Sequence, residues 1–182
     1  MNPRPENVHR KHLIVSIGTE VYVTLAKGQI PPTDRDTASP TRVPGGGHLL
    51  IIPISHYPTI STIPADLAPP ILSEIDTYKS ALRTMYGKFG AIPVFFEMSR
   101  LSGRGGHAHV QVVPIPESKK NGVEEAFKDY GGQQVDWEDD PVGVLGEAAG
   151  GKMGYFRVDL PDGRKMVHVL KPGKMFNIQF GR

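Results

Sequence analysis

Two histidines and a glutamine recur at every second position between residues 107 and 111. They are His107, His109 and Gln111, and Val113 continues the same alternation. In an extended strand, side chains two residues apart point to the same face, so the two imidazoles and the amide would share one face. All three groups can present N–H donors to the oxygens of an anion. The pattern therefore predicts a site for a phosphate group.

The middle imidazole of this row, His109, has the position expected of a nucleophile. A neutral imidazole can attack phosphorus in line and form a phosphohistidine-type intermediate while neighbouring donors hold the non-bridging oxygens. Gln111 can orient a phosphate but cannot act as a general acid or base, so the row lacks an obvious proton donor for the leaving group. The alternative reading is two half-exposed histidines on the outer face of an antiparallel sheet.

The glycine-rich segment just before the histidines adds further candidate contacts. Its glycines would let backbone N–H groups come close to a phosphate, and its arginines would supply positive charge. Besides His107 and His48, we expect contacts to a phosphate or nucleotide from Arg100, Ser102, Arg104, Gly105 and Gly106. RNA binding through the two arginines would weaken with salt, because phosphate contacts release counterions.

The hydrophobic pattern predicts the elements that position these residues. Apolar, β-branched runs predict strands over residues 12–17, 20–26, 48–52 and 91–98, a strand that carries the histidine row, and a hairpin over 155–160 and 164–170. Apolar residues at helical spacing predict a long helix from Asp66 to Tyr86, with Pro69 and Pro70 in its first turn. Residues 28–47 gather Gly, Pro, Asp, Thr and Ser, which predicts a mobile surface loop.

Composition limits the class of protein. The chain has 182 residues, of which 38% are hydrophobic and 22% charged, enough for one ordinary domain with a core. It has no cysteine, so these residues can build neither a disulfide nor a thiolate metal site. No stretch approaches the roughly 20 consecutive apolar residues of a spanning helix, and we expect no membrane partner. The net charge of +2 does not indicate wholesale nucleic-acid binding.

Several segments carry a resemblance to a known family. His48-Leu-Leu-Ile-Ile-Pro-Ile-Ser-His56 and the row His107-Ala-His-Val-Gln-Val-Val113 resemble the histidine-triad superfamily. With Lys11-His-Leu-Ile-Val-Ser-Ile-Gly18, Val112-Val-Pro-Ile-Pro116 and the terminal Gln179-Phe-Gly-Arg182, they look like the C-terminal region of CwfJ-type proteins. Gly154-Tyr-Phe-Arg-Val-Asp-Leu-Pro-Asp-Gly163 is most similar to the lariat-debranching-associated branch of that family.

The resemblance implies a fold and a cellular role. The expected fold class is α+β, histidine-triad-like, with a mostly antiparallel sheet, a long packed helix and a C-terminal β-hairpin appendage. We expect a core over residues 1–116, an acidic and Gly-rich linker or lid over 117–153 with a short helix near 123–130, and a β extension over 154–182 packed on the core. The resemblance also implies nuclear residence, a part in pre-mRNA splicing and intron lariat turnover, and partners among RNA or nucleotides, the lariat debranching enzyme and spliceosomal proteins.

Two departures from the family pattern affect the expected chemistry. Gln111 stands where the triad has its third histidine, as in the galactose-1-phosphate uridylyltransferase branch, which uses the middle histidine as nucleophile. A C-x-x-C pair usually precedes the stretch matching Lys11 onward, and it is absent here. By analogy, such a pair would join His56 and His107 around zinc, so we expect zinc only in a full-length protein and no certain cofactor in this chain. Fuller members also carry a metallophosphoesterase-like domain, so we expect this chain to be a fragment.

Three functions stay open at this point. The first is a nucleotide- or RNA-phosphate-binding module, with His109 and Gln111 at its centre. The second is an active nucleotidyl hydrolase or transferase that passes through a covalent nucleotidyl-His109. The third is a protein-interaction module in which the site is vestigial. A homodimer that pairs through sheet edges is a further open alternative.

Overall fold

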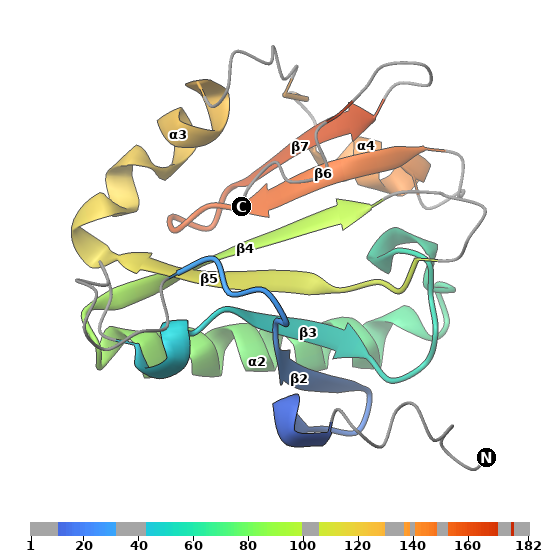
Figure 1. The fold of residues 1–182 in the computed structure, drawn as a ribbon. Coiled ribbons are helices and arrows are strands. Elements are labelled where there is room, and N and C mark those ends of the chain that lie inside the picture. The colour runs from blue at the N-terminus through green and yellow to red at the C-terminus, as the bar shows by residue number, and fades with distance from the viewer. Residues whose placement is uncertain are drawn as a thin grey trace.

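A computed structural model describes residues 11–31, 43–99, 106–129, 137–138, 141–148, 153–170 and 176. Within these ranges the chain forms an α+β fold on a seven-stranded sheet (Figure 1). The strands are β1 (Ile14–Ile17), β2 (Val21–Leu25), β3 (Leu49–Pro53), β4 (Ala91–Ser99), β5 (Val110–Pro116), β6 (Gly154–Asp159) and β7 (Lys165–Leu170). Their order across the sheet is β1-β2-β3-β5-β4-β6-β7, and each neighbouring pair is antiparallel. The expected α+β class with a mostly antiparallel sheet is confirmed.

Helices connect the strands. The long helix is α2 (Ala68–Gly87), and the short ones are η1 (Lys11–Leu13), η2 (Pro44–Gly46), η3 (Ile60–Thr62), η4 (Glu117–Gly122), α3 (Val123–Asp129) and α4 (Pro141–Ala148). None of the described helices is long and apolar enough to cross a membrane.

Helix α2 confirms the helical spacing read from the sequence. Its prolines lie in the first turn, where no backbone donor is needed, and it ends at Gly87. Its buried residues are Ile71, Ile75, Lys79, Leu82 and Tyr86. Because four of these five side chains are mainly apolar and share one side, the helix covers one face of the sheet.

The two faces of the sheet bury different hydrophobic clusters. Val110 and Val112 of β5 pack in the cluster that contains the apolar side of α2. Val113 belongs to a second cluster, on the opposite face, together with Phe96 and Phe156. The alternation predicted for residues 107–113 therefore holds through β5, and its apolar side packs on the helix as expected.

The segment 141–148 differs from the expectation of a linker or lid. It forms helix α4, in addition to the short helix α3 that the sequence predicted. The partly buried Val144 and Leu145 of α4 pack against Tyr155 of β6 and Val167 of β7. Gly143 and Gly146 lower the intrinsic helix propensity of this segment, so tertiary packing stabilises the helix.

The approach to β3 also differs from the mobile loop expected over 28–47. Residues 28–31 and 43–47 of that stretch hold defined positions, while residues 32–42 lie outside the described residues. Gly45, Gly46 and Gly47 have φ angles of 67°, 77° and 71°, which favour glycine. The Tyr86 hydroxyl of α2 donates a hydrogen bond to the Gly47 carbonyl. The turn therefore fixes the entry of the chain into β3, directly before His48.

Candidate functional site

His48 and Gln111 meet across neighbouring strands. Leu50 of β3 pairs with Gln111 of β5, and His48 lies two residues before Leu50, so the imidazole and the amide share a face. His48 Nε2 lies 3.2 Å from Gln111 Oε1, and His48 Nδ1 lies 3.2 Å from the Gly28 carbonyl oxygen. With only 1% of its surface exposed, His48 orients Gln111 from below the surface of the site.

The position of the hydrogen on the His48 ring decides which end of the Gln111 amide can face it. A backbone carbonyl only accepts, so His48 Nδ1 must carry the hydrogen that points to Gly28. A neutral imidazole then has only a lone pair at Nε2, which requires the NH2 end of the Gln111 amide to face it. An imidazolium would instead donate to Gln111 Oε1. The neutral ring therefore leaves Gln111 Oε1, an acceptor, for a ligand, whereas the imidazolium leaves the NH2 end, which can donate to a phosphate oxygen.

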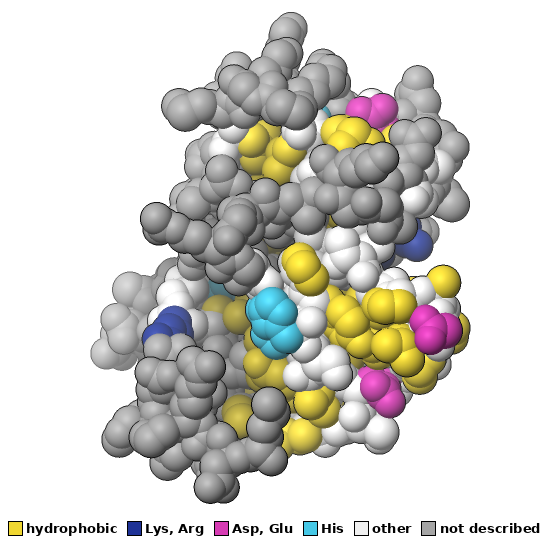
Figure 2. All heavy atoms as spheres, turned by 90° about the vertical axis from the view of Figure 1, so that its right-hand side faces the viewer, with side chains coloured by type: hydrophobic (Ala, Val, Ile, Leu, Met, Phe, Trp, Pro, Cys, Tyr) yellow, Lys and Arg dark blue, Asp and Glu magenta, His cyan; other side chains and the backbone are white. Residues whose placement is uncertain are grey.

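His107 and His56 form the second pair of predicted site residues. Their ring centroids are 4.8 Å apart. His107 Nε2 lies 2.9 Å from the Pro53 carbonyl oxygen, and the Ala108 N–H donates to the Tyr57 carbonyl at 2.7 Å. These bonds tie the segment before β5 to the segment that follows β3. Figure 2 shows histidine side chains at this end of the molecule, beside hydrophobic side chains.

The environment of His107 favours its neutral form. Burial lowers the pKa of His107 below the ordinary imidazole value and is the largest cause. The backbone contacts with Pro53 and Ser55 oppose this shift. Repulsion from His56 and His109 adds to the lowering of the pKa.

His109 has the tautomer that a nucleophile needs. Its Nδ1 lies 2.9 Å from the His107 carbonyl oxygen, so Nδ1 carries a hydrogen and donates. In the neutral ring this leaves the lone pair on Nε2. The side chain is partly exposed, whereas Ala108 and Val110 on either side are buried. The neighbouring backbone thus fixes one nitrogen of the ring, while the side chain as a whole stays partly exposed.

The histidines do not lie in the strand itself, which corrects the sequence reading. Strand β5 begins at Val110, and residues 106–109 form the connection into it. The alternation of exposure nevertheless continues upstream, with His107, His109 and Gln111 partly exposed. Backbone bonds to the segment after β3 replace strand pairing in this connection.

The loop residues proposed as phosphate contacts are described only in part. Gly106 is partly buried at the start of the connection. Arg100, Ser102, Arg104 and Gly105 lie outside the described residues. Their contacts with a phosphate stay a prediction.

A metal site is not assembled from the described residues. They contain no group of three or more His, Asp, Glu or Cys side chains that could hold an ion. His107 Nε2 carries the hydrogen that it donates to the Pro53 carbonyl, so Nδ1 is the nitrogen of that ring that could bind an ion. His56 and His107 are only two ligands, fewer than the four that are the rule for a zinc site.

Sequence reasoning missed the residues that hold His48. The Gln29 Oε1 accepts from the His48 backbone N–H at 2.9 Å, and Gln29 Nε2 donates to the His48 carbonyl at 3.0 Å. Gly28 supplies the carbonyl that fixes the His48 tautomer. Both residues lie in a segment whose composition indicated only a loop, and no local pattern marked them.

Comparison with known proteins places the chain in a family. The family model described as protein similar to CwfJ C-terminal matches residues 5–128. CWF19-like protein mug161 of Schizosaccharomyces pombe is 33% identical over 94% of this chain and 29% of its own length. Zinc finger CCCH domain-containing protein 64 of Arabidopsis thaliana is 33% identical over 99% of this chain and 30% of its own length. CWF19-like protein 1 of Homo sapiens is 32% identical over 94% of this chain and 28% of its own length.

The chain thus spans less than a third of the length of these relatives. The matched residues 5–128 include all five strands from β1 to β5, the helix α2 and both pairs of candidate site residues, His48 with Gln111 and His56 with His107. The resemblance read from the sequence and the match to the family model agree. The chain belongs to the family of proteins similar to the CwfJ C-terminal region.

Proposed function

We propose that the chain is a nucleotide- or RNA-phosphate-binding module with a histidine-triad-like site centred on His109. The observation that carries this proposal is the hydrogen bond from His109 Nδ1 to the His107 carbonyl. It leaves a lone pair on Nε2 of a partly exposed side chain, two residues from an amide that His48 orients. A phosphate at this position would accept from the Gln111 NH2 end when His48 is an imidazolium, and from backbone N–H groups near Gly106.

The cellular role follows from the family resemblance. The resemblance to CwfJ-type proteins implies a part in pre-mRNA splicing and in the turnover of intron lariats, in the nucleus. We propose the same role for this chain, with RNA as the ligand and the lariat debranching enzyme or spliceosomal proteins as partners. The modest net charge of +2 supports recognition by a local site and not by an extended basic surface.

The His109 tautomer also favours a second candidate function, which is covalent nucleotidyl transfer. His109 Nε2 would attack phosphorus, a P–N bond would form, and the bond from phosphorus to the leaving atom, an oxygen or the nitrogen of a phosphoramidate, would break with its electron pair on that atom. The Gln111 amide is not acidic enough to protonate that atom. Transfer should therefore occur only with leaving groups that need little protonation, such as pyrophosphate or an activated phosphoramidate.

Calorimetric titration tests the binding function. We expect adenosine monophosphate and a short single-stranded RNA to bind, and adenosine without a phosphate to bind much more weakly. His109→Ala should abolish the preference for the phosphorylated ligand, whereas His12→Ala, an exposed histidine outside the row, should leave it unchanged. Equal binding of adenosine and its monophosphate would contradict the proposal.

Mass spectrometry separates binding from transfer. Incubation with an activated nucleoside phosphoramidate should give a nucleotidyl adduct on the chain if His109 is a nucleophile, and His109→Ala should give none. Branched RNA should remain intact, because its 2′ leaving oxygen needs a proton. Efficient debranching that is lost in His109→Ala would overturn the binding-module function, and a missing adduct would remove the transfer function alone.

A further inference from the structure

A short segment after β2 crosses the sheet next to the site. The Ala26 N–H donates to the His48 carbonyl at 3.2 Å, and Gln29 bonds both to the Ala26 carbonyl and to the His48 backbone. Ile30 packs in the second cluster, on the face opposite α2. In Figure 1 this segment runs across β3 toward β5. The backbone on both sides of Lys27 is therefore fixed.

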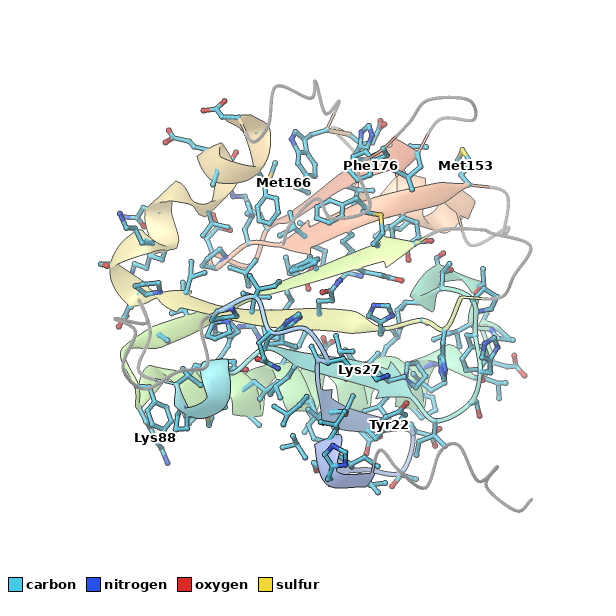
Figure 3. The ribbon with its side chains drawn as sticks, in the orientation of Figure 1. Tyr22, Lys27, Lys88, Met153, Met166 and Phe176 are labelled. Carbon is cyan, nitrogen blue, oxygen red and sulfur yellow. The ribbon has the colours of Figure 1, made fainter. Side chains whose placement is uncertain are left out.

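Lys27 precedes Gly28, a residue that contacts His48 of the candidate site. The next residue is Gly28, whose carbonyl lies 3.2 Å from one ring nitrogen of His48. The other ring nitrogen of His48 lies 3.2 Å from Gln111 Oε1. Figure 3 shows Lys27 over β3, while Lys88 lies at the far end of the molecule. The Lys27 side chain is exposed, and its long flexible stem lets the ammonium take positions several bonds away from this backbone.

The described part of the site has no other fixed cation. His107 is held toward its neutral form, and Gln111 is an uncharged amide. Lys79 and Arg157 are bonded to Asp159 on the face that α2 covers, so neither is available. The described residues provide no ion-pair partner for Lys27. A phosphate ligand carries negative charge that such a site must match.

We propose that Lys27 is the cation of this site and binds a non-bridging phosphate oxygen of the ligand that His109 and Gln111 hold. This inference rests on the proposed function, and it names a ligand contact that neither the histidine row nor the glycine-rich loop contains. The segment that carries Lys27 also orients His48 through Gly28 and Gln29. One segment would therefore supply both the charge and the orientation of the amide.

The test compares two lysines in the full chain. Lys27→Ala and Lys88→Ala remove the same charge from exposed side chains, so a general effect of net charge would appear in both variants. We expect Lys27→Ala to weaken adenosine monophosphate binding about three- to fivefold, as for an exposed charge pair. Lys88→Ala should bind as the wild type does, and Lys27→Arg should retain most of the affinity. Adenosine should bind equally to all four proteins.

Salt dependence provides a second readout. For a short single-stranded RNA, the slope of log affinity against log salt should fall by about 0.7 in Lys27→Ala, the value for one lost phosphate contact. Thermal unfolding checks that the variant stays folded. If the wild type binds no phosphate ligand, the proposed function itself fails. If it binds, and His109→Ala weakens binding while Lys27→Ala matches Lys88→Ala, only the role of Lys27 is overturned.

Discussion

Carbonyl oxygens set the tautomers of the site histidines. The carbonyls of Gly28, Pro53 and His107 face His48 Nδ1, His107 Nε2 and His109 Nδ1, respectively. Since a carbonyl only accepts, each of these nitrogens carries a hydrogen. The backbone thus decides which nitrogen of each ring keeps its lone pair. For His109 that nitrogen is Nε2, which is the basis of the proposed chemistry.

The lowered pKa of His107 can be measured directly. In a histidine-labelled sample, His107 should titrate below the ordinary imidazole pKa of about 6.5. His56→Ala removes one repulsive neighbour and should raise the pKa of His107, which should still stay below 6.5 because burial is the larger cause. An NMR titration of the imidazole resonances measures both values. A His107 pKa above 6.5 in the wild type would contradict the described burial.

The same shift fixes the sign of a pH effect on stability. The folded-state pKa of His107 lies below the unfolded value, so the unfolded chain binds more protons as the pH falls below about 6.5. This group therefore makes the free energy of unfolding decrease on acidification in that window. Replacing His107 by Gln should reduce that decrease, as urea unfolding at several pH values would show.

The turn before β3 connects the candidate site to helix α2. Gly47 has a φ of 71°, and a Cβ built on it would clash with Val43 Cγ1 and lie 3.2 Å from Tyr86 Cε1. The turn therefore needs glycine both for its backbone conformation and for its close packing. His48 is the next residue, so the position of the turn determines where the imidazole meets Gln111.

Gly47→Ala should consequently affect stability and binding together. A non-glycine residue in this backbone region costs about 1–3 kcal/mol, and the contacts with Val43 and Tyr86 add to that cost. Gly45→Ala is the matched control, since Gly45 also has a positive φ but its Cβ would meet nothing within 4 Å. Urea unfolding and calorimetric titration of the two variants provide the comparison. Equal losses of stability and of affinity in the two variants would show that the packing around Gly47 contributes to neither.

Periodicity predicted most of the elements, and its failures have physical causes. The apolar spacing of α2 and the β-branched runs report burial on one side, which is local information. The start of β5 at Val110 depends on bonds from Pro53 and Tyr57, more than fifty residues earlier in the sequence. Helix α4 depends on contacts with β6 and β7. Such distant partners leave no local pattern in the sequence.

In the candidate site, too, the sequence predicted local features and missed long-range contacts. The alternation of His107, His109 and Gln111 could be recognised in the sequence because side chains alternate along extended backbone, both within β5 and before it. The pairing of His48 with Gln111 required the order of β3 and β5 in the sheet. Gly28, Gln29 and Lys27 were not predictable, because a loop composition does not say what the loop crosses.

A buried ion pair joins helix α2 to the C-terminal strand β6. The family model ends at residue 128, yet β6 pairs with β4 and extends the same sheet. Lys79 Nζ of α2 lies 2.7 Å from Asp159 Oδ2 of β6, and Arg157 Nε lies 2.8 Å from Asp159 Oδ1. Glu97 of β4, which is buried beside them with its pKa raised by burial, completes the cluster. Residues beyond the family match thus complete the packing against α2.

Replacing Asp159 and replacing Lys79 should lower the free energy of unfolding by different amounts. Asp159→Ala leaves both Lys79 and Arg157 without their carboxylate and should lower the free energy of unfolding by about 3–5 kcal/mol. Lys79→Met keeps the Asp159–Arg157 pair and fills the volume of the lysine stem, so its loss should be clearly smaller. Urea unfolding measures both. A loss in Lys79→Met equal to that in Asp159→Ala would contradict the described network.

The most direct test of the phosphate site observes His109 itself. A chain labelled with 15N in its histidines is titrated with adenosine monophosphate and, separately, with adenosine, while the imidazole nitrogens are recorded by NMR. We predict that the monophosphate shifts the Nε2 resonance of His109, that the Nδ1 hydrogen stays bound to the His107 carbonyl, and that adenosine leaves both unchanged. A monophosphate that binds without moving the His109 resonances, or that does not bind at all, would contradict a phosphate site centred on His109.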